Sequence, residues 1–321
     1  MQVTKDIIVD AVITWVDGND PMHKAKMANY IENKTSLNSK FVRTRYDQVN
    51  EIEYAVKSIL KYAKFVRNIF IITDNQTPDF LKDKEKAKKE YPSVFVIDHK
   101  TIFEGHHQYL PTFNSRSIET QVYKVPNLSE RFIYFNDDFF LLKKINIEDF
   151  FIDGLPVLRG KWLKFDEDIF YKKIKFLFIK KKKGIGHKIA QQKAAKIIGL
   201  KKYFKFHHTP QPFRKSTFET YFKKNTLLET SNIEPRFRSE SQFIPQSLAN
   251  HLEIKTKTCI LKNDYQLVYF QNYKKPFFWI KYKLMQSVKN ENKLFLCMQS
   301  LDQCPEKKLS FIKKRLSDKY D

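Results

Sequence analysis

The stretch Phe132-Ile133-Tyr134-Phe135-Asn136-Asp137-Asp138-Phe139-Phe140-Leu141-Leu142 places two adjacent carboxylates between two strongly apolar runs. The aromatic and β-branched residues of the first run predict a buried strand that ends at Asn136. Burying Asp137 and Asp138 without partners would be costly. A divalent cation offsets that cost, and oxygen ligands favour Mg²⁺ or Mn²⁺. We therefore predict that Asp137 and Asp138 bind a metal ion.

Other strand-like runs of the first 150 residues also end in polar side chains. These exits are Asp17-Gly18-Asn19-Asp20 after residues 7–16, Asp74-Asn75 after residues 69–73, and Asp98-His99 after residues 94–97. Asp and Asn often do no more than start a loop. Several such exits together favour a site, because ligands of open parallel sheets bind beyond the carboxyl ends of the strands.

Helix-like stretches separate these runs. Asn50, with Glu53 three residues later, predicts a capped helix whose apolar residues recur at helical spacing, and Asn114 predicts the cap of another. Buried strands alternating with helices predict an α/β fold with a mainly parallel sheet flanked by helices. The sequence contains neither G-x-G-x-x-G nor a Walker loop, so it is not a standard nucleotide-binding fold.

The chain has 321 residues and a formal charge of +23, which predicts attraction to polyanions such as phosphate-bearing substrates or anionic lipid. Codon bias in an AT-rich genome is the alternative source of many of its lysines. Its three cysteines form no metal or disulfide framework. No signal peptide and no run near the ~20 apolar residues of a membrane span are evident. We expect a cytoplasmic protein, with the inner face of the cytoplasmic membrane as an alternative location.

Residues 161–205 hold 15 lysines and three acidic residues, with apolar residues interleaved. This pattern is typical of a basic surface helix that meets anionic lipid, and equally of a solvated insertion with a charged outer face. Nucleic acid is not expected as a partner, because no recognised module accompanies the charge. We predict residues 1–160 as the N-terminal α/β part of a catalytic domain, 161–205 as a basic helical insertion, and 206–321 as the part that completes the domain and adds a helical tail.

Three later residues have the chemistry of a reaction site. His208 lies in the Pro-stiffened segment His207-His208-Thr209-Pro210, which suits a fixed general acid or base. Arg238 offers a guanidinium that can fork onto phosphate. Asp264 follows another strand-like run. A structural His and a surface Arg are the commoner outcomes for such residues taken singly.

Four groups of residues, in this order along the chain, resemble the conserved blocks of one family. They are Ile13-Thr14-Trp15-Val16-Asp17-Gly18-Asn19-Asp20; residues 43–47 through 72–76 and 110–115 to Asn136-Asp137-Asp138; residues 208–210 through Arg238-Ser239; and Asn263-Asp264. The family is that of the Stealth hexose-1-phosphate transferases. It includes bacterial capsular polysaccharide phosphotransferases and the catalytic subunit of the Golgi N-acetylglucosamine-1-phosphotransferase.

The resemblance implies a GT-A-like transferase that uses a nucleotide-sugar donor and Mg²⁺ or Mn²⁺. It would pass a sugar-1-phosphate to a hydroxyl of an oligo- or polysaccharide acceptor, release a nucleoside monophosphate, and act in capsule or surface polysaccharide synthesis. The implied catalytic residues are His208, Arg238 and Asp264. The implied substrate-binding residues are Asp17, Asn19, Asp20, Arg45, Asn75, Asn114 and Arg116. A conventional glycosyltransferase that releases the nucleoside diphosphate, and a non-catalytic protein that binds polyanions or membranes, are the alternatives.

Overall fold

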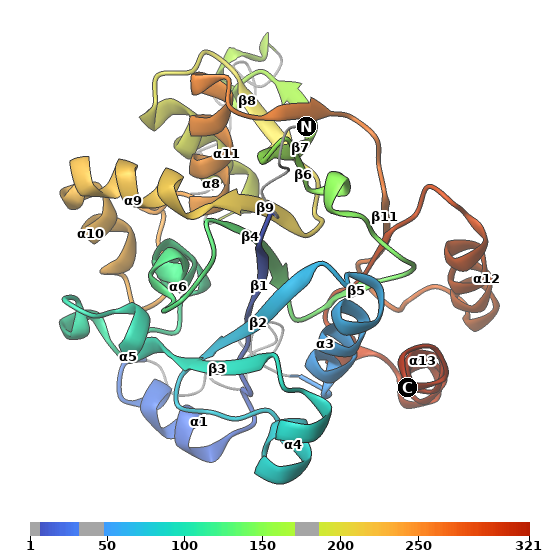
Figure 1. Cartoon of the computed structure of the whole chain (residues 1–321). Helices are drawn as coiled ribbons and strands as arrows, with labels where there is room; N and C mark the ends of the chain where they lie inside the picture. Colours follow the sequence, from blue (N-terminus) through green and yellow to red (C-terminus); the bar gives the residue numbers. More distant parts are fainter. Residues whose placement is uncertain (1–6, 32–47, 171–185) are drawn as a thin grey trace, which may run out of the picture.

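The computed structural model describes residues 7–31, 48–170 and 186–321 (Figure 1). The strands are β1 Val9–Thr14, β2 Val66–Thr73, β3 Val94–Asp98, β4 Arg131–Asn136, β5 Phe139–Leu141, β6 Phe151–Ile152, β7 Leu155–Leu163, β8 Tyr203–Phe206, β9 Gln211–Arg214, β10 Ile260–Lys262, β11 Leu267–Phe270 and β12 Phe295–Met298. The α-helices are α1 Pro21–Ala28, α3 Glu51–Tyr62, α4 Lys84–Glu90, α5 His99–Ile102, α6 Ser115–Gln121, α8 His187–Ile197, α9 Lys215–Lys224, α10 Thr226–Ile233, α11 Pro245–Thr256, α12 Phe277–Lys289 and α13 Glu306–Tyr320.

The central sheet has the strand order β3-β2-β1-β4-β9. Strands β3, β2, β1 and β4 are parallel, and β9 closes the edge antiparallel to β4. The predicted α/β fold with a mainly parallel, helix-flanked sheet is therefore confirmed. The first 136 residues supply all four parallel strands, with helices in the crossovers between them (Figure 1).

Both faces of the central sheet are buried, which is why its strands have nearly continuous apolar sequences. Along β1, Ala11 and Ile13 pack into the core that includes α3, whereas Val12 packs into the core on the opposite face. Helix α3 lies on one side of the strands and α6 on the other (Figure 1). The carboxyl ends of the parallel strands are thereby held in a rigid frame between two apolar layers.

Two smaller sheets extend this frame. One has the order β11-β12-β5, and in it β5 runs antiparallel to β12. The other joins β10, β7 and β6, with β8 paired to β7. Strand β5 begins directly after Asp138, so the turn at Asn136-Asp137-Asp138 connects the central sheet to the sheet that contains β12.

The two predicted helix caps had different outcomes. The Asn114 side chain accepts a hydrogen bond from the Arg116 backbone N–H, which confirms it as the cap of α6. Asn50 stands at the start of α3 but has a left-handed backbone (φ 65°) and makes no capping bond, so the capping-box prediction was wrong. The Glu51 side chain instead accepts from the Val49 N–H, which holds the chain before the helix.

The described parts of residues 161–205 are built into the fold. They comprise the end of β7, helix α8 and most of β8, and Ala190, Ala194 and Ala195 of α8 are buried. Residues 171–185, with many of the lysines, lie outside the described residues. The three-part division of the chain stays a prediction. Among the described residues, no helix combines the length and the apolar character that crossing a membrane requires.

Candidate active site

The topology brings polar residues from distant parts of the chain to one edge of the central sheet. Because β1 to β4 are parallel, their carboxyl ends meet there, and Thr14 lies opposite both Ile72 and Asn136. Strand β9 runs the other way, with Gln211 opposite Tyr134, so the residues before β9 arrive at the same edge. His208 therefore lies beside the Asp137-Asp138 turn.

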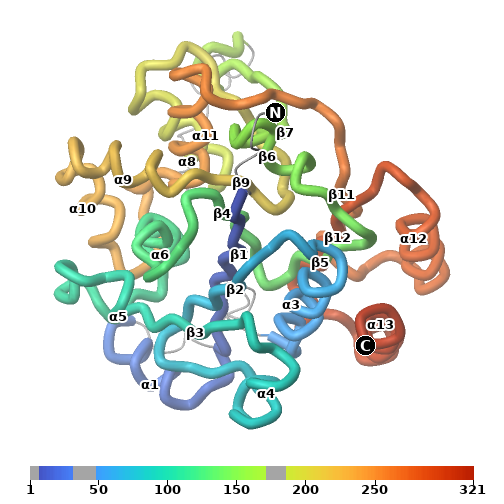
Figure 2. Tube along the Cα trace, in the orientation of Figure 1, coloured from blue at the N-terminus to red at the C-terminus, as the bar shows by residue number. Residues whose placement is uncertain are grey.

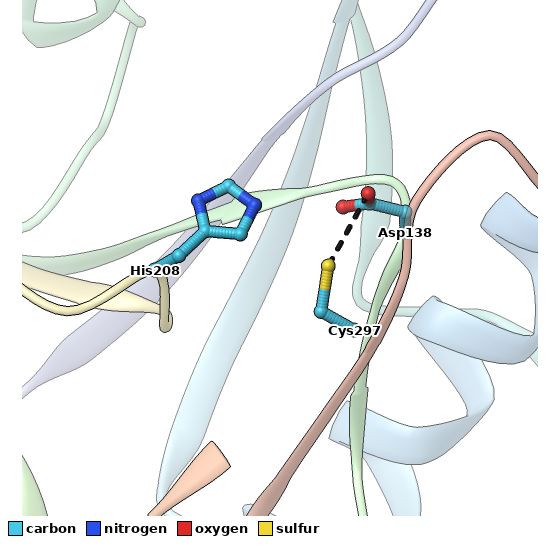
Figure 3. Close-up of side chains that lie close together, drawn as sticks. All are labelled: Asp138, His208 and Cys297. Atoms are coloured by element: carbon cyan, nitrogen blue, oxygen red, sulfur yellow. Dashed lines mark hydrogen bonds between the residues drawn. The ribbon is translucent and has the colours of Figure 1, made fainter. Parts of the chain in front are cut away.

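Asp138 lies at this edge of the sheet, next to His208 and Cys297 (Figure 3). Its carboxylate Oδ2 accepts a hydrogen bond from Cys297 Sγ at 3.4 Å, and its backbone carbonyl accepts from Met298 N at 3.1 Å. Its other oxygen, Oδ1, is buried and has no hydrogen-bond partner among the described residues. Asp138, His208 and Cys297 each offer one ligand atom, and these atoms lie within 4.8 Å of one another.

The ring of His208 is held by aromatic contacts. Its centroid is 4.9 Å from that of Phe139 and 5.5 Å from that of Tyr269, both edge-on. Burial lowers the pKa of His208, and the charge of Asp138 opposes this effect. The imidazole is therefore largely neutral at pH 7 and able to accept a proton.

The two adjacent carboxylates have raised pKa values. Burial and then the negative charges of Asp138 and Glu51 raise the pKa of Asp137 well above its usual range. Burial also raises the pKa of Asp138, whereas the nearby His208 opposes the rise. Positive charge from a ligand would stabilise the ionised form of both groups.

Two arginines, Arg116 and Arg238, also lie near this edge of the sheet. Arg238 donates from Nη2 to Ser115 Oγ at 2.8 Å, and the buried Arg116 donates from Nη1 to the Ser239 carbonyl at 3.2 Å. Burial and then the charge of Arg238 lower the pKa of Arg116 to about 10. The two guanidinium groups thus repel each other, and Glu119, which interacts with both, opposes this effect. A bound anion would relieve the repulsion further.

These groups line a cavity of about 670 Å³. Asp138, His208, Arg116 and Arg238 all contribute to its wall. Lys161 of β7 and Lys205 of β8, which face each other in the β7–β8 pair, add two more cationic side chains. Glu119 lines the cavity as well. The cavity therefore combines two carboxylates with four cationic side chains, which suits a phosphate-bearing ligand that binds with a metal ion.

A smaller cavity of about 210 Å³ adjoins the first, and Arg238, Asn136 and Tyr134 line both. Asp137 lines the smaller cavity. Its wall also includes Trp15, whose Nε1 is buried without a hydrogen-bond partner among the described residues. The adjacent carboxylates Asp137 and Asp138 thus face two connected spaces.

The predicted substrate-binding residues of the β1 loop stabilise the loop itself. Gln76 Nε2 donates to the Asp17 carbonyl and to Asp20 Oδ2, both at 2.9 Å. Asp20 Oδ1 also caps α1 by accepting from Met22 N. Asp17 Oδ1 accepts from the backbone N–H of Asn19 at 2.9 Å. Neither cavity has any of these three predicted residues in its described lining.

Of the remaining predicted substrate-binding residues, some line the cavities and others do not. The exposed Asn75 has a positive φ of 52°, and its N–H donates to Asp98 Oδ2. Asn114 is buried, lines the smaller cavity, and donates to the Pro235 carbonyl and Gln242 Oε1. Arg116 lines the larger cavity. Arg45 lies outside the described residues.

Asp264 is not in the cavity that contains Asp138. Both of its carboxylate oxygens accept from Nε of the buried Arg159, at 3.1 and 3.0 Å. It lines a different, open hollow together with Trp162 and Lys161, and Lys161 also lines the cavity of Asp138. The predicted meeting of Asp264 with His208 and Arg238 is therefore not observed, and a catalytic role for Asp264 stays a prediction without geometric support.

Several residues in or beside the cavity had no signal in the sequence. Cys297 reaches Asp138 through the antiparallel pairing of β12 with β5, although 159 positions separate the two residues. Lys161 and Lys205 were grouped with lysines expected at a lipid or solvent surface. Gln299, which follows β12, also lines the cavity. Strand pairing brings these residues to the site, and local sequence patterns do not reveal which strands pair.

Together these features define an α/β protein with a cation-rich cavity that includes a carboxylate at the strand ends. Two family models match its sequence: Stealth protein conserved region 1 over residues 9–35 and conserved region 2 over residues 45–158. The chain thus contains the first two conserved regions of the Stealth family, as its motifs indicated. The matched regions include the Asp137-Asp138 turn but not His208, Arg238 or Asp264.

Curated relatives match the same part of the chain. The capsular polysaccharide phosphotransferase cps1A of Actinobacillus pleuropneumoniae is 44% identical over 145 residues, which are 44% of this chain and 38% of that protein. The exopolysaccharide phosphotransferase cps2G of Lactiplantibacillus plantarum is 38% identical over 149 residues, 46% of this chain and 41% of that protein. The chain thus aligns with about two fifths of the length of these relatives.

Glycosyltransferases are among the solved structures that align with the chain. The galactosyltransferase LgtC, in complex with donor and acceptor sugar analogues, aligns over 97% of this chain and 95% of its own at 8% identity, with a TM-score of 0.44. The glycosyltransferase GlyE of Streptococcus pneumoniae aligns over 92% of this chain and 55% of its own at 13% identity, with a TM-score of 0.39. The GT-A-like assignment continues to depend on the family resemblance.

Proposed function

We propose that this protein transfers a sugar-1-phosphate from a nucleotide sugar to a hydroxyl of a glycan, in the synthesis of a bacterial capsule or surface polysaccharide. The names of the similar proteins, capsular and exopolysaccharide phosphotransferases, support this class of reaction. The observation that carries the proposal is the larger cavity, in which Asp138 and His208 face Arg116 and Arg238.

The cationic side chains suit the diphosphate of the donor. Arg238 and Arg116 would bind phosphate oxygens, and their fork geometry would hold the phosphorus in line for attack. Phosphoryl transfer depends mainly on such positioning and on neutralising negative charge, rather than on covalent catalysis. Lys161 and Lys205 would add charge at the mouth of the same space.

The residues present fit a divalent cation. Asp138 has a buried carboxylate oxygen without a partner among the described residues, and Asp137 is adjacent. We infer that these two carboxylates would hold Mg²⁺ or Mn²⁺, which when bound neutralises charge on the donor phosphates. Cys297 donates to Asp138 Oδ2 and would orient this carboxylate.

We infer that His208 acts as the general base. The acceptor oxygen would attack the phosphorus that carries the sugar, while its proton passes to the imidazole of His208. A bond forms between that oxygen and the phosphorus, and the bond to the bridging oxygen of the diphosphate breaks. The nucleoside monophosphate leaves with that oxygen, and the product is a phosphodiester between sugar and glycan.

The smaller cavity suits the nucleoside of the donor. Trp15 and Phe113 contribute aromatic walls, and Trp15 Nε1 together with Thr112 Oγ1 is buried without a partner among the described residues. A planar base could pack against these rings and accept from the indole N–H. Since Arg238 lines both cavities, the diphosphate would lie between them.

The nucleotide released from the donor tests this proposal. The protein would be incubated with candidate UDP-sugars, a glycan acceptor and Mg²⁺ or Mn²⁺, and the products separated by chromatography. Release of UMP, with transfer of the sugar-1-phosphate to the glycan, is expected. Release of UDP would show a conventional glycosyltransferase instead, and an absence of turnover with every donor tested would favour a binding protein.

A further inference from the structure

Helix α12 presents half of its large apolar side chains to solvent. The exposed fractions are 72% for Phe278, 55% for Tyr282, 48% for Met285 and 55% for Val288. Their spacing of three or four residues places them on one face of the helix. Within α12, which the structure describes completely, the buried residues are Ile280 and Ser287. The helix packs Ile280, Trp279 and Leu284 toward the core and leaves a second apolar face uncovered.

A groove separates this face from α13. Helices α12 and α13 stand beside each other at the margin of the molecule, away from the central sheet (Figures 1 and 2). The groove has a volume of about 760 Å³, and Leu296, Ile312 and Leu316 contribute apolar lining. Lys281 and Arg315 line it as well. The exposed apolar area thus continues from α12 toward α13.

Basic side chains accompany this apolar face. Helix α12 contains Lys281, Lys283 and Lys289 and no acidic residue. The Nζ atom of Lys281 is 4.5 Å from the ring centroid of Phe277 and 5.4 Å from that of Phe311. The Arg315 guanidinium also lies over Phe311, at 5.4 Å. Positive charges are therefore next to the apolar groups rather than on a separate face.

This combination favours an anionic bilayer as the occupant. A second copy of the chain, packed symmetrically through α12, would bring Lys281 and Lys289 near their own counterparts, which is repulsive. A nucleic acid would meet the lysines but would leave Phe278 and Met285 without an apolar partner. Anionic headgroups and the acyl region beneath them provide both the negative charge and the apolar layer that this surface lacks.

We propose that the α12 surface, formed by Phe278, Tyr282, Met285, Val288, Lys281 and Lys289, binds the interface of an anionic lipid bilayer. The apolar side chains enter the boundary between headgroups and acyl chains, and the lysines lie at headgroup level. This surface differs from the lysine-rich residues 161–205 for which the sequence predicted lipid contact. It is independent of the proposed transfer reaction.

Vesicle flotation of the full chain tests the proposal. Vesicles of phosphatidylcholine with phosphatidylglycerol are compared with vesicles of phosphatidylcholine alone, at low and high salt. Binding to the anionic vesicles is expected, with a marked loss in about 0.5 M salt, because the Debye length falls from about 10 Å at 0.1 M toward about 3 Å at 1 M and the attraction between lysines and headgroups is screened. The double variant Phe278→Ser, Met285→Ser is expected to weaken partitioning by roughly tenfold or more. Lys281→Gln with Lys289→Gln is expected to weaken it by about tenfold.

Matched controls separate this surface from the rest of the chain. Leu227 of α10 is 86% exposed, and Leu227→Ser removes an equally accessible apolar residue from a different helix. Asp138→Asn alters the candidate active site and is expected to leave vesicle binding unchanged. Thermal unfolding of each variant shows whether it is folded, which is expected because the substituted α12 side chains are largely exposed.

Other results would overturn the proposal. Folded α12 variants that bind as the wild type does, or a wild type that does not distinguish anionic from neutral vesicles, would contradict it. If substitution of Lys180–Lys183 by Gln removes binding while the α12 variants retain it, the lipid contact belongs to that segment. A concentration-dependent dimer in sedimentation that the α12 variants dissociate, without vesicle binding, would assign the surface to a second copy.

Discussion

Asp138 and Asp264 each follow a strand, and each belongs to a group of residues that resembles a conserved block of the Stealth family. Their surroundings nevertheless differ. Arg159 donates to both oxygens of Asp264, so this carboxylate has its partner within the protein. Asp138 has one buried oxygen without a partner among the described residues, in a cavity with two arginines. The comparison indicates that a carboxylate with unused hydrogen-bonding capacity is the better candidate for binding a ligand.

The same contrast holds within the strand exits. Asp17 and Asp20 are bound to Gln76 and to the backbone of their own loop, so the exit of β1 is stabilised locally. The exit of β4 leaves Asp137 and Asp138 facing two connected cavities. Carboxylates at the same edge of one sheet can therefore have different functions, according to which partners the neighbouring loops provide.

Asp138→Asn would give the largest effect in this comparison. Removing the charge is expected to lower the rate of sugar-phosphate transfer by roughly a thousandfold, because the donor phosphates lose their cation. The melting temperature is expected to stay the same or rise, because burial disfavours the ionised carboxylate. Product formation and thermal unfolding would be measured on the same preparation, and a variant within tenfold of the wild-type rate would contradict the assignment.

Arg238→Lys tests whether Arg238 acts through its positive charge alone or also through the geometry of its guanidinium group. Lysine keeps the charge but loses the fork that holds two phosphate oxygens, so kcat/KM for the donor is expected to fall by about 10- to 100-fold. Arg67→Lys is the matched control, because Arg67 forms a bidentate pair with Asp10 away from the cavity. Equal losses of activity in the two variants would mean that Arg238 acts through general stability.

His251 is a buried group in contrast to Asp138, because both of its ring nitrogens have hydrogen-bond partners. Its Nε2 accepts from Phe204 N at 2.8 Å, and burial lowers the pKa of His251 to about 4. A folded pKa below the unfolded value of about 6.5 means that its stabilising contribution is present above pH 6.5 and is lost as the pH falls toward 4. The loss is expected to reach about 3 kcal/mol near pH 4.

Urea unfolding at pH 7 and pH 4.5 would measure this acid sensitivity. His251→Gln is expected to show a smaller drop in the free energy of unfolding between the two pH values than the wild type shows. A variant with the same drop as the wild type would assign the sensitivity to other groups. Transfer activity of the variant at pH 7 is expected to remain near the wild-type value.

Asp264→Asn is expected to have the smallest effect. The pair with Arg159 is partly exposed, with 44% of the Asp264 side chain accessible, so its loss should cost about 1 kcal/mol of stability. Transfer activity is expected to stay within tenfold of the wild type. An activity loss as large as that of Asp138→Asn would instead support the catalytic role that the family resemblance implies for Asp264.

The sequence predicted the central sheet because its strands are short apolar runs between amphipathic helices, a pattern that depends on neighbouring residues. It also predicted the Asp137-Asp138 turn as a site. It did not predict Asp264's position, because the rule about strand exits holds for strands of one sheet, and β10 belongs to a different sheet from β4. Cys297 reaches Asp138, and Lys205 reaches the cavity, through strand pairs distant in sequence, which no local pattern records.

Binding of Mn²⁺ tests the central claim most directly, since it needs neither donor nor acceptor. Titration followed by the electron paramagnetic resonance signal of free Mn²⁺ would compare the wild type with Asp138→Asn, His208→Gln and Asp264→Asn. The account predicts binding by the wild type, by His208→Gln and by Asp264→Asn, and at least tenfold weaker binding by Asp138→Asn. Unchanged affinity in Asp138→Asn, or loss of binding in Asp264→Asn, would contradict it.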